Sequence, residues 1–227
     1  KNITLRTQGY YRSAPARSET AVPAGAKRSD TYLIYKKNSF PDFSLPLQPK
    51  PAYTMKTIPL FDDFSLRSLC SGDAPAIFGA IDTQREHLGR WLPFVAATHR
   101  VEQTQEVVAG MLNDTANPVF TIRSGDAFAG LIGFKSADGT TRTIEIGYWL
   151  RSEFQGRGIM TSAVQALCRL AFEEIGMERI EIRCAPGNLR SNRIPQRLGF
   201  RLDRVEVRGE QLSDGEFVDL NIYLLER

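Results

Sequence analysis

Residues 143–161 read Thr143-Ile144-Glu145-Ile146-Gly147-Tyr148-Trp149-Leu150-Arg151-Ser152-Glu153-Phe154-Gln155-Gly156-Arg157-Gly158-Ile159-Met160-Thr161. The β-branched and aromatic side chains of the first eight residues predict a strand. A short glycine-punctuated loop then opens directly into a helix. The first helical turn has backbone amides without partners and a positive dipole end. Glycines let a ligand phosphate approach these amides, so the stretch predicts a pyrophosphate cradle without a Walker lysine. A plain strand-to-helix turn is the alternative.

Around this stretch the sequence alternates helices and strands. Apolar residues from Ile159 to Ala171 recur at steps of three and four, which predicts the strongest helix, and Gly176 ends it. The full predicted order is β-α-α-β-β-β-α-β-α-β-β over about 170 residues, a mixed sheet with helices on its faces. The predicted strands are Ser65–Leu69, Val119–Arg123, Phe128–Lys135, Thr143–Leu150, Arg179–Cys184, Arg201–Arg208 and Phe217–Leu225.

Residues 1–54 differ from the rest of the chain. They carry nine Lys/Arg and three Asp/Glu, whereas residues 55–227 have a net charge of −3. Four prolines between Pro41 and Pro51 interrupt any regular element there. We therefore expect residues 1–54 to be a basic, flexible leader and residues 55–227 to be the folded domain. The first methionine is Met55, so the leader could be upstream sequence, a transit peptide or an RNA-contacting arm.

Composition excludes several classes of protein. Hydrophobic residues at 42% and charged residues at 24% are typical of a globular chain, and no apolar run is long enough to cross a membrane. Three cysteines without a CxxC spacing and only two histidines argue against a disulfide framework or a metal site, and favour a reducing cytoplasm. The slightly acidic domain does not indicate a nucleic-acid interface.

The sequence resembles the GNAT acetyltransferase superfamily, and within it the RimJ/RimL type, which acetylates the N-termini of ribosomal proteins. The family's phosphate motif, Gln/Arg-x-x-Gly-x-Gly/Ala, is matched from Gln155 except that Met160 replaces the small residue. The resemblance covers about residues 57–226. The matching segments are Arg90-Trp91-Leu92-Pro93, Glu145–Leu150, Gln155–Ile159, Asn188-x-x-Ser191-Asn192, Leu198-Gly199-Phe200 and Asp219-x-Asn221-x-Tyr223.

The resemblance implies an α/β (α+β) GNAT fold. We expect a mixed, mostly antiparallel sheet of about seven strands with about four flanking helices. The strand Ile144–Leu150 should bulge and splay from Arg179–Cys184, with acetyl coenzyme A in the resulting V. Its expected binding residues are Tyr148, Trp149, Leu150, Gln155, Gly156, Arg157, Gly158, Ile159, Met160, Asn188 and Ser191; Arg157 could equally be a solvated loop arginine, and Asn188 a helix cap.

Acetyl transfer needs a neutral amine and a thiolate that can leave. An α-amino group has a pKa near 8, so about a tenth is already neutral at pH 7 and the base need only relay a proton. The resemblance assigns this base to a glutamate beside the penultimate strand, which is Glu210 here. Glu145 is the alternative base, and could instead be a structural carboxylate. Ser191 matches the family serine that meets the sulfur, unless it is only a helix cap.

Two further positions carry expectations. Trp91 matches a region that forms part of the acceptor wall in this superfamily, together with Glu145, although plain hydrophobic packing is the other interpretation. Pro195 departs from the family pattern. Because proline lacks a backbone donor, we expect it to shorten or kink the helix that holds Ser191 and to disturb Asn192.

The expected function is acetyl-CoA-dependent N-acetylation of a primary amine, most of all the N-terminal α-amine of a protein such as a ribosomal protein. Acetylation of a polyamine, amino sugar or antibiotic is an alternative, because fold and cofactor do not separate acceptors. A non-catalytic acyl-CoA-binding module is the third. No metal, membrane or nucleic-acid partner is expected of the domain, and a homodimer is possible.

Overall fold

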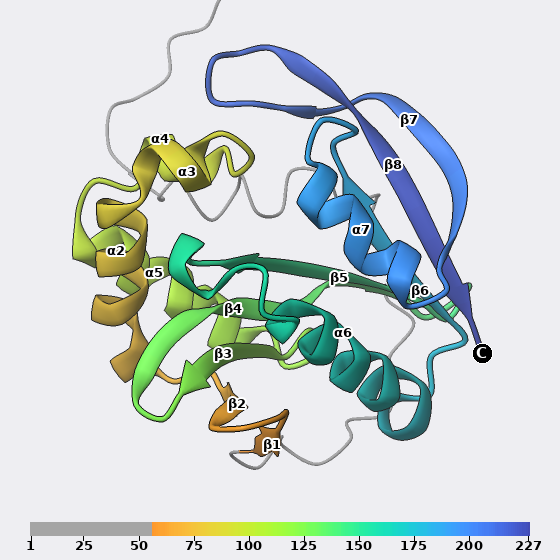
Figure 1. Ribbon diagram of the computed structural model, residues 1–227, viewed down its shortest axis with the longest axis horizontal. Coiled ribbons are helices and arrows are strands. Elements are labelled where there is room, and N and C mark those ends of the chain that lie inside the picture. Colours follow the sequence, from red (N-terminus) through yellow and green to blue (C-terminus); the bar gives the residue numbers. More distant parts are fainter. Residues whose placement is uncertain (1–55) are drawn as a thin grey trace, which may run out of the picture.

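The computed structural model describes residues 56–227, so the predicted leader lies outside the described residues. Eight strands form one sheet in the order β1-β2-β3-β4-β5-β6-β8-β7 (Figure 1). The strands are β1 Thr57–Pro59, β2 Phe64–Ser68, β3 Val119–Ser124, β4 Ala127–Asp138, β5 Thr143–Leu150, β6 Arg179–Cys184, β7 Arg201–Gln211 and β8 Phe217–Glu226.

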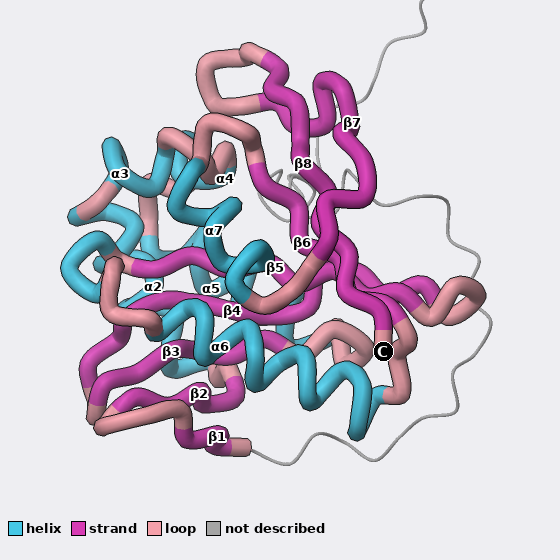
Figure 2. Tube along the Cα trace, turned by 45° about the vertical axis from the view of Figure 1, so that its right-hand side comes forward, coloured by secondary structure: helices cyan, strands magenta, loops and turns pink. Residues whose placement is uncertain are grey.

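Helices cover both faces of the sheet. Figure 2 shows α6 and α7 on one side of the strands and α2 and α5 on the other. The helices are α2 Ala74–Thr83, α3 Arg85–Gly89, α4 Phe94–Ala97, α5 Val101–Asn113, α6 Ile159–Arg169 and α7 Leu189–Arg197, with η1 Ser71–Asp73, η2 Ser152–Phe154 and η3 Leu170–Ile175 as shorter or wider turns.

The two helical layers pack on separate apolar clusters. One cluster joins α6 to the sheet through fully buried residues such as Ile144, Leu167 and Ile180. The other joins α2 to β4 and β5 through residues such as Ile81, Leu131 and Trp149. Because side chains alternate along a strand, β5 gives even-numbered residues to the first layer and odd-numbered ones to the second.

The sheet divides between β5 and β6. All neighbouring strands in it are antiparallel except this pair, which is parallel and is joined through α6. The β5–β6 register runs only from Thr143↔Arg179 to Glu145↔Glu181. Beyond Glu145 the two strands no longer pair, which confirms the expected V and leaves one edge of β5 open.

The bulge beside this opening lies on a different strand from the one expected. Phe134 pairs with Ile146 and Ser136 with Glu145, so Lys135 is an extra residue on β4, not on β5. An extra residue bends the strand that carries it and re-aims a side chain. The bulge therefore delivers Lys135 to the apex of the V, next to Glu145.

The element count also differs slightly from the expectation. The sheet has eight strands because the short β1 pairs with β2 at the edge, and α3 and α4 are two short helices within the connection that contains Trp91. β4 runs on to Asp138, past the predicted end at Lys135. Within residues 56–227, no helix has the length and apolar character that a membrane span requires.

Candidate active site

The loop before α6 has the geometry expected of a phosphate cradle. Gly156 and Gly158 have positive φ angles of 77° and 79°, which side-chain-bearing residues rarely adopt. A Cβ at either position would meet nothing within 4 Å, so the space in front of the loop is open. Ile159 and Met160 bury their side chains in the core. Met160 thus replaces the family's small residue with a side chain that packs in the core.

Gln155 links this loop to three other elements. Its amide nitrogen lies 3.3 Å from the Leu150 carbonyl and 2.8 Å from Nε2 of His87. The guanidinium of Arg190 on α7 donates to its amide oxygen. Sequence reasoning found Gln155 but missed His87 and Arg190, because their positions 68 and 35 residues away along the chain give no local signal.

Arg157 follows Gly156 on an exposed part of the loop. Its guanidinium lies over the ring of Phe64 on β2, with its central carbon 4.9 Å from the ring centroid. Such a cation–π contact holds the side chain at the side of the cradle. Arg157 lies between the two glycines of the loop, so it could add positive charge beside a bound phosphate. In this structure its guanidinium contacts the Phe64 ring.

Three polar side chains meet at the open edge of β5. The Ser191 hydroxyl donates to the Tyr148 oxygen (3.2 Å), and the Tyr148 hydroxyl donates to the Ser191 carbonyl (3.3 Å). The sulfur of Cys184 lies 3.1 Å from Oγ of Ser191. Because the Ser191 proton points to Tyr148, the thiol of Cys184 is the donor in that contact. Ser191 is thus in the V, where the resemblance places the sulfur of the acyl donor.

Both neighbours of Ser191 hold their protons firmly. Burial, with a smaller contribution from Cys184, raises the pKa of Tyr148 well above its ordinary value. Burial also raises the pKa of the Cys184 thiol to about 11. Cys184 is therefore a protonated core residue at neutral pH, as its alternation with Ile180 and Ile182 suggests, and not a nucleophile.

The helix that carries Ser191 begins at Asn188, whose side-chain oxygen accepts from the Ser191 amide at 3.2 Å. Asn188 therefore acts as the cap and Ser191 sits in the first turn. Asn192 is 5% exposed and fully bonded, donating to the Ala185 carbonyl and accepting from the Tyr223 hydroxyl at 3.0 Å.

Pro195 does not shorten this helix or displace Asn192, contrary to expectation. α7 continues through Pro195 to Arg197 and keeps Asn192 in place. The missing N–H of Pro195 affects the carbonyl four residues earlier, that of Ser191. Tyr148 supplies the lost hydrogen bond, which explains why the helix tolerates a proline in its interior.

Charged side chains occupy the opposite face of the sheet. Glu145, at the apex of the V, pairs with Lys135 at 2.8 Å and lies 4.0 Å from Arg183. Arg183 also pairs with Glu206 on β7. Lys135 lies across Gly147, where a Cβ would come within 2.6 Å of its side chain. Glu145 is therefore a carboxylate already held by two cations.

Glu210 joins the same cluster. Burial raises the pKa of Glu210, the charges of Glu145 and Glu206 add to the rise, and Lys135 and Arg183 offset part of it. The structure thus brings together the two glutamates that the sequence offered as alternatives. A carboxyl with a raised pKa is a better proton acceptor at neutral pH than an ordinary one.

A long bulge on β7 determines where Glu210 points. Glu206 pairs with Leu220 and Glu210 with Val218, so three residues of β7 face one residue of β8. Arg208 takes a positive φ of 55° inside this bulge. Because Val218 and Leu220 share one face of β8, Glu206 and Glu210 share it too. Glu210 therefore lies within β7, where the sequence placed it just beyond a strand ending at Arg208.

Trp91 reaches the site from the other helical layer. A Cβ on Gly187 would lie 3.2 Å from Cη2 of Trp91, so the indole packs against the loop between β6 and α7. The guanidinium of Arg90 lies 5.1 Å from its ring centroid. Trp91 is half-buried and spans the V from the α3–α4 connection, as a wall of the acceptor site would.

Trp149 contributes differently from Tyr148. Its side chain is buried in the α2 cluster and packs edge-on against Phe128, with ring centroids 5.7 Å apart. Only its backbone is available at the V. Leu150 is also buried, and its carbonyl accepts from Gln155.

No group of three His, Cys, Asp or Glu side chains within residues 56–227 has an arrangement suited to a metal ion.

The two faces together have the groups that acyl transfer requires. Ser191, Tyr148 and Cys184 lie on the α7 side of the sheet, and Glu145 and Glu210 lie on the other. Between the two groups, β5 and β6 no longer pair beyond Glu145. An acetyl group carried by coenzyme A between the splayed strands would have hydroxyl donors on one side and a proton acceptor on the other, with the phosphates of the coenzyme at the α6 loop.

Known proteins are similar to this chain in sequence and in fold. A family model described as the acetyltransferase (GNAT) domain matches residues 63–201. The putative ribosomal N-acetyltransferase YdaF of Bacillus subtilis (strain 168) is 30% identical over 75% of this chain and 95% of its own length. The ribosomal-protein-serine acetyltransferase of Escherichia coli (strain K12) is 29% identical over 74% and 95%.

Solved structures agree. The RimL ribosomal L7/L12 alpha-N-protein acetyltransferase in complex with coenzyme A has a TM-score of 0.72 at 26% identity, over 75% of this chain and 98% of that one. The microcin C7 self-immunity acetyltransferase MccE, in complex with acetyl-CoA and AMP, has a TM-score of 0.71 at 25% identity, over 78% and 100%. The chain therefore belongs to the GNAT acetyltransferase family and is an acetyl-CoA-dependent N-acetyltransferase similar to the RimL enzyme.

Proposed function

We propose that this N-acetyltransferase acts on the N-terminal α-amine of a protein such as a ribosomal protein. The observation that carries the proposal is the match, over nearly their whole lengths, to two relatives whose names specify ribosomal acceptors. The position of the acid cluster supports it. Glu206 and Glu210 lie half-buried on β7, the edge strand of the sheet, where an extended chain has access.

In the proposed mechanism Glu210 accepts the proton of the acceptor amine. Its raised pKa suits this role, because a base whose pKa lies closer to the working pH shares the proton more evenly with the amine. Glu145 is paired with Lys135. Its role is instead electrostatic, because its negative charge helps to raise the pKa of Glu210. Glu145 and Trp91 then form the floor and one wall of the acceptor site.

Ser191 serves the leaving sulfur. As the amine nitrogen forms its bond to the acetyl carbon, the carbon–sulfur bond would break with its electron pair on sulfur, and the Ser191 hydroxyl would turn from Tyr148 to donate to that sulfur. Tyr148 keeps its own proton on the Ser191 carbonyl. Backbone groups on the open edge of β5, at Tyr148, Trp149 and Leu150, hold the pantetheine arm, and amides from Gln155 to Met160 hold the pyrophosphate.

A thiol-release assay with a panel of acceptors tests the proposal. The panel contains peptides with free N-termini, the same peptides with acetylated N-termini but free lysines, polyamines, amino sugars and aminoglycosides. Turnover confined to free N-termini supports the proposal. Turnover of lysine-only peptides or of small amines alone contradicts it, and no turnover of any amine would favour a non-catalytic acyl-CoA-binding module.

A small amine is the second candidate, because the microcin C7 self-immunity acetyltransferase MccE, whose name specifies no ribosomal acceptor, has a similar TM-score. The two candidates differ in the length of acceptor that they need. A peptide acceptor should gain in kcat/KM as residues are added after the first, since each added residue finds further contacts along β7. A small-amine enzyme should show no such gain.

A cytoplasmic location and a homodimer remain predictions.

A further inference from the structure

Three exposed arginines follow one face of α7. Arg190, Arg193 and Arg197 are spaced at i, i+3 and i+7, so their side chains lie in a row. α7 contains no acidic residue. Among the described residues, none of the three forms an ion pair with a carboxylate.

Other arginines in this half of the protein do form ion pairs with carboxylates. On the neighbouring strands Arg201 pairs with Asp203, and Arg204 pairs with Glu181 at 2.9 Å. Like charges three or four residues apart on a helix repel one another. The row on α7 is therefore an unfavourable arrangement for the protein alone, and a bound anion would relieve it.

The helix dipole accounts for only one member of the row. Arg197 lies in the last turn of α7, where a cation is favourable. Arg190 lies in the first turn, at the positive end of the dipole, where a cation is unfavourable. Arg190 and Arg193 are thus the two cations that the helix itself does not stabilise.

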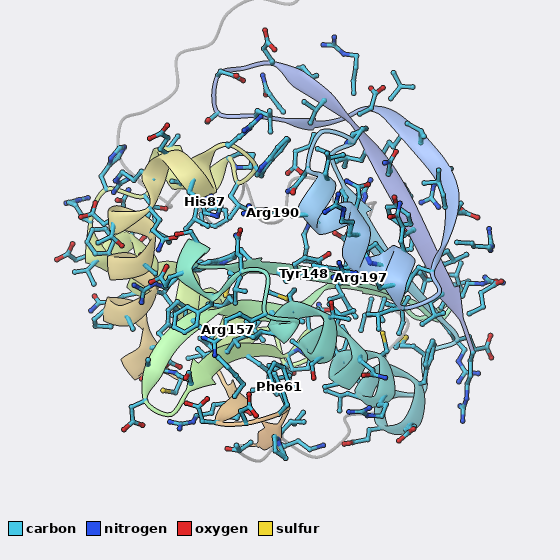
Figure 3. All side chains as sticks on the ribbon, in the orientation of Figure 1. Phe61, His87, Tyr148, Arg157, Arg190 and Arg197 are labelled. Carbon is cyan, nitrogen blue, oxygen red and sulfur yellow. The ribbon has the colours of Figure 1, made fainter. Side chains whose placement is uncertain are left out.

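The row begins at the phosphate loop. The Arg190 guanidinium donates to the side-chain oxygen of Gln155, and Arg193 follows about one helical turn farther along. In Figure 3, Arg190 and Arg197 lie along α7 and Arg157 lies at the start of α6, all on the side of the sheet that these helices cover. A ligand whose pyrophosphate occupies the loop would extend its remaining charge toward this row.

We propose that Arg193, with Arg190 beside it, binds the 3′-phosphate of coenzyme A. Coenzyme A carries one anionic group besides the pyrophosphate, a phosphate on its adenosine ribose. The loop amides at Gly156–Met160 match the pyrophosphate, and the two arginines match the second group through charge-assisted hydrogen bonds. This inference deepens the cofactor part of the proposed function and does not depend on the acceptor.

The test compares the binding of coenzyme A and 3′-dephospho-coenzyme A by calorimetry, without any acceptor. The wild-type chain should bind coenzyme A on the order of tenfold more tightly, as one charge-assisted contact would give. Arg193→Gln should reduce this preference, and Arg190→Gln with Arg193→Gln should abolish it. Affinity for the dephospho form should stay close to wild type in Arg193→Gln.

Arg197→Gln is the matched control, because it removes the same charge from the same helix at a position that the dipole explains. It should keep the preference. Equal binding of both ligands by the wild-type chain would overturn the proposal, as would a full preference in the double variant. Neither result would bear on the acceptor, since no amine is present.

Discussion

The Tyr148 hydroxyl donates to the carbonyl of Ser191, the one carbonyl of α7 that Pro195 deprives of its helical N–H partner. The Ser191 hydroxyl donates back to the Tyr148 oxygen. Tyr148 belongs to β5 and Ser191 to α7, which stand on the two sides of the V. Pro195 on α7 thus leaves the Ser191 carbonyl free to accept a hydrogen bond from Tyr148 on β5.

The shared carbonyl gives a stability prediction. Tyr148→Phe should destabilise the chain by about 1–3 kcal/mol, because the Ser191 carbonyl and hydroxyl both lose a partner. In a Pro195→Ala background the cost should be smaller, since the N–H of residue 195 then bonds the carbonyl. Urea unfolding of the four chains measures this coupling. An identical cost in both backgrounds would show that the two residues act independently.

The raised pKa of Glu210 predicts how stability changes with pH. Between the ordinary glutamate pKa and the higher folded-state pKa, the folded chain binds more protons than the unfolded one. Stability contributed by this group is therefore lost as pH rises through that window. Glu210→Gln should gain stability relative to wild type as pH rises from about 4 to 8.

Urea unfolding at a series of pH values measures this trend. Glu216→Gln is the control, because Glu216 is exposed in the turn before β8. It should leave the pH dependence of the free energy of unfolding unchanged. A constant difference between wild type and Glu210→Gln across the range would mean that Glu210 titrates normally.

Glu210 should also dominate the chemistry. Glu210→Gln should lower kcat/KM by about 10²–10⁴, as loss of a general base does. The deficit should shrink as pH rises, because more of the amine is then neutral without help. Glu145→Gln should cost less, since Glu145 is paired with Lys135. If Glu145→Gln abolishes turnover and Glu210→Gln does not, the proton leaves along β5.

Ser191→Ala should separate binding from turnover. The affinity for acetyl-CoA should stay close to wild type, because the Asn188 cap uses the Ser191 amide and not its hydroxyl. The value of kcat should fall, but by less than in Glu210→Gln, since a thiol pKa near 8.5 lets the thiolate leave unaided. Steady-state kinetics with calorimetry distinguish the two quantities. A large loss of affinity would assign Ser191 to binding.

The phosphate loop gives a binding prediction with a matched control. Gly158→Asp should abolish measurable coenzyme affinity, because it strains a residue with φ near 79° and adds a negative charge at the cradle. Gly215→Asp imposes similar strain, with φ of 87°, in the turn between β7 and β8, on a different part of the chain from the loop. It should bind coenzyme A normally. Equal losses in both variants would point to unfolding and not to the cradle.

Local patterns predicted much of this fold. The periodic apolar residues of α6 and the alternation in β6 define elements whose type follows from short-range sequence. β1 was missed because it has three residues, the last of them Pro59, and draws its order from pairing with β2. α3 and α4 lie in a connection whose helical turns depend on packing around Leu88 and Phe94.

The site was predicted less completely, because the pairing register of β4 with β5 and of β7 with β8 could not be read from the sequence. Glu145 and Glu210 looked like rival bases because 65 positions separate them in the sequence. The bulges at Lys135 and Arg208 bring them into one charged cluster, and bulges leave no reliable local pattern. The effect of Pro195 was also misjudged, because the sequence gives no sign that the Tyr148 hydroxyl donates to the Ser191 carbonyl.

The unpaired edge of β5 beyond Glu145 has a consequence for hydrogen exchange. Amide protons that point into the ladder between β4 and β5 are shielded by that pairing, whereas those on the free edge have no strand to protect them. An extended pantetheine chain lying there would take the place of the absent strand. Coenzyme binding should therefore slow deuterium uptake along one edge of Ile146–Leu150 and leave the other edge as it was, which makes the ligand a ninth, non-peptide strand of the sheet.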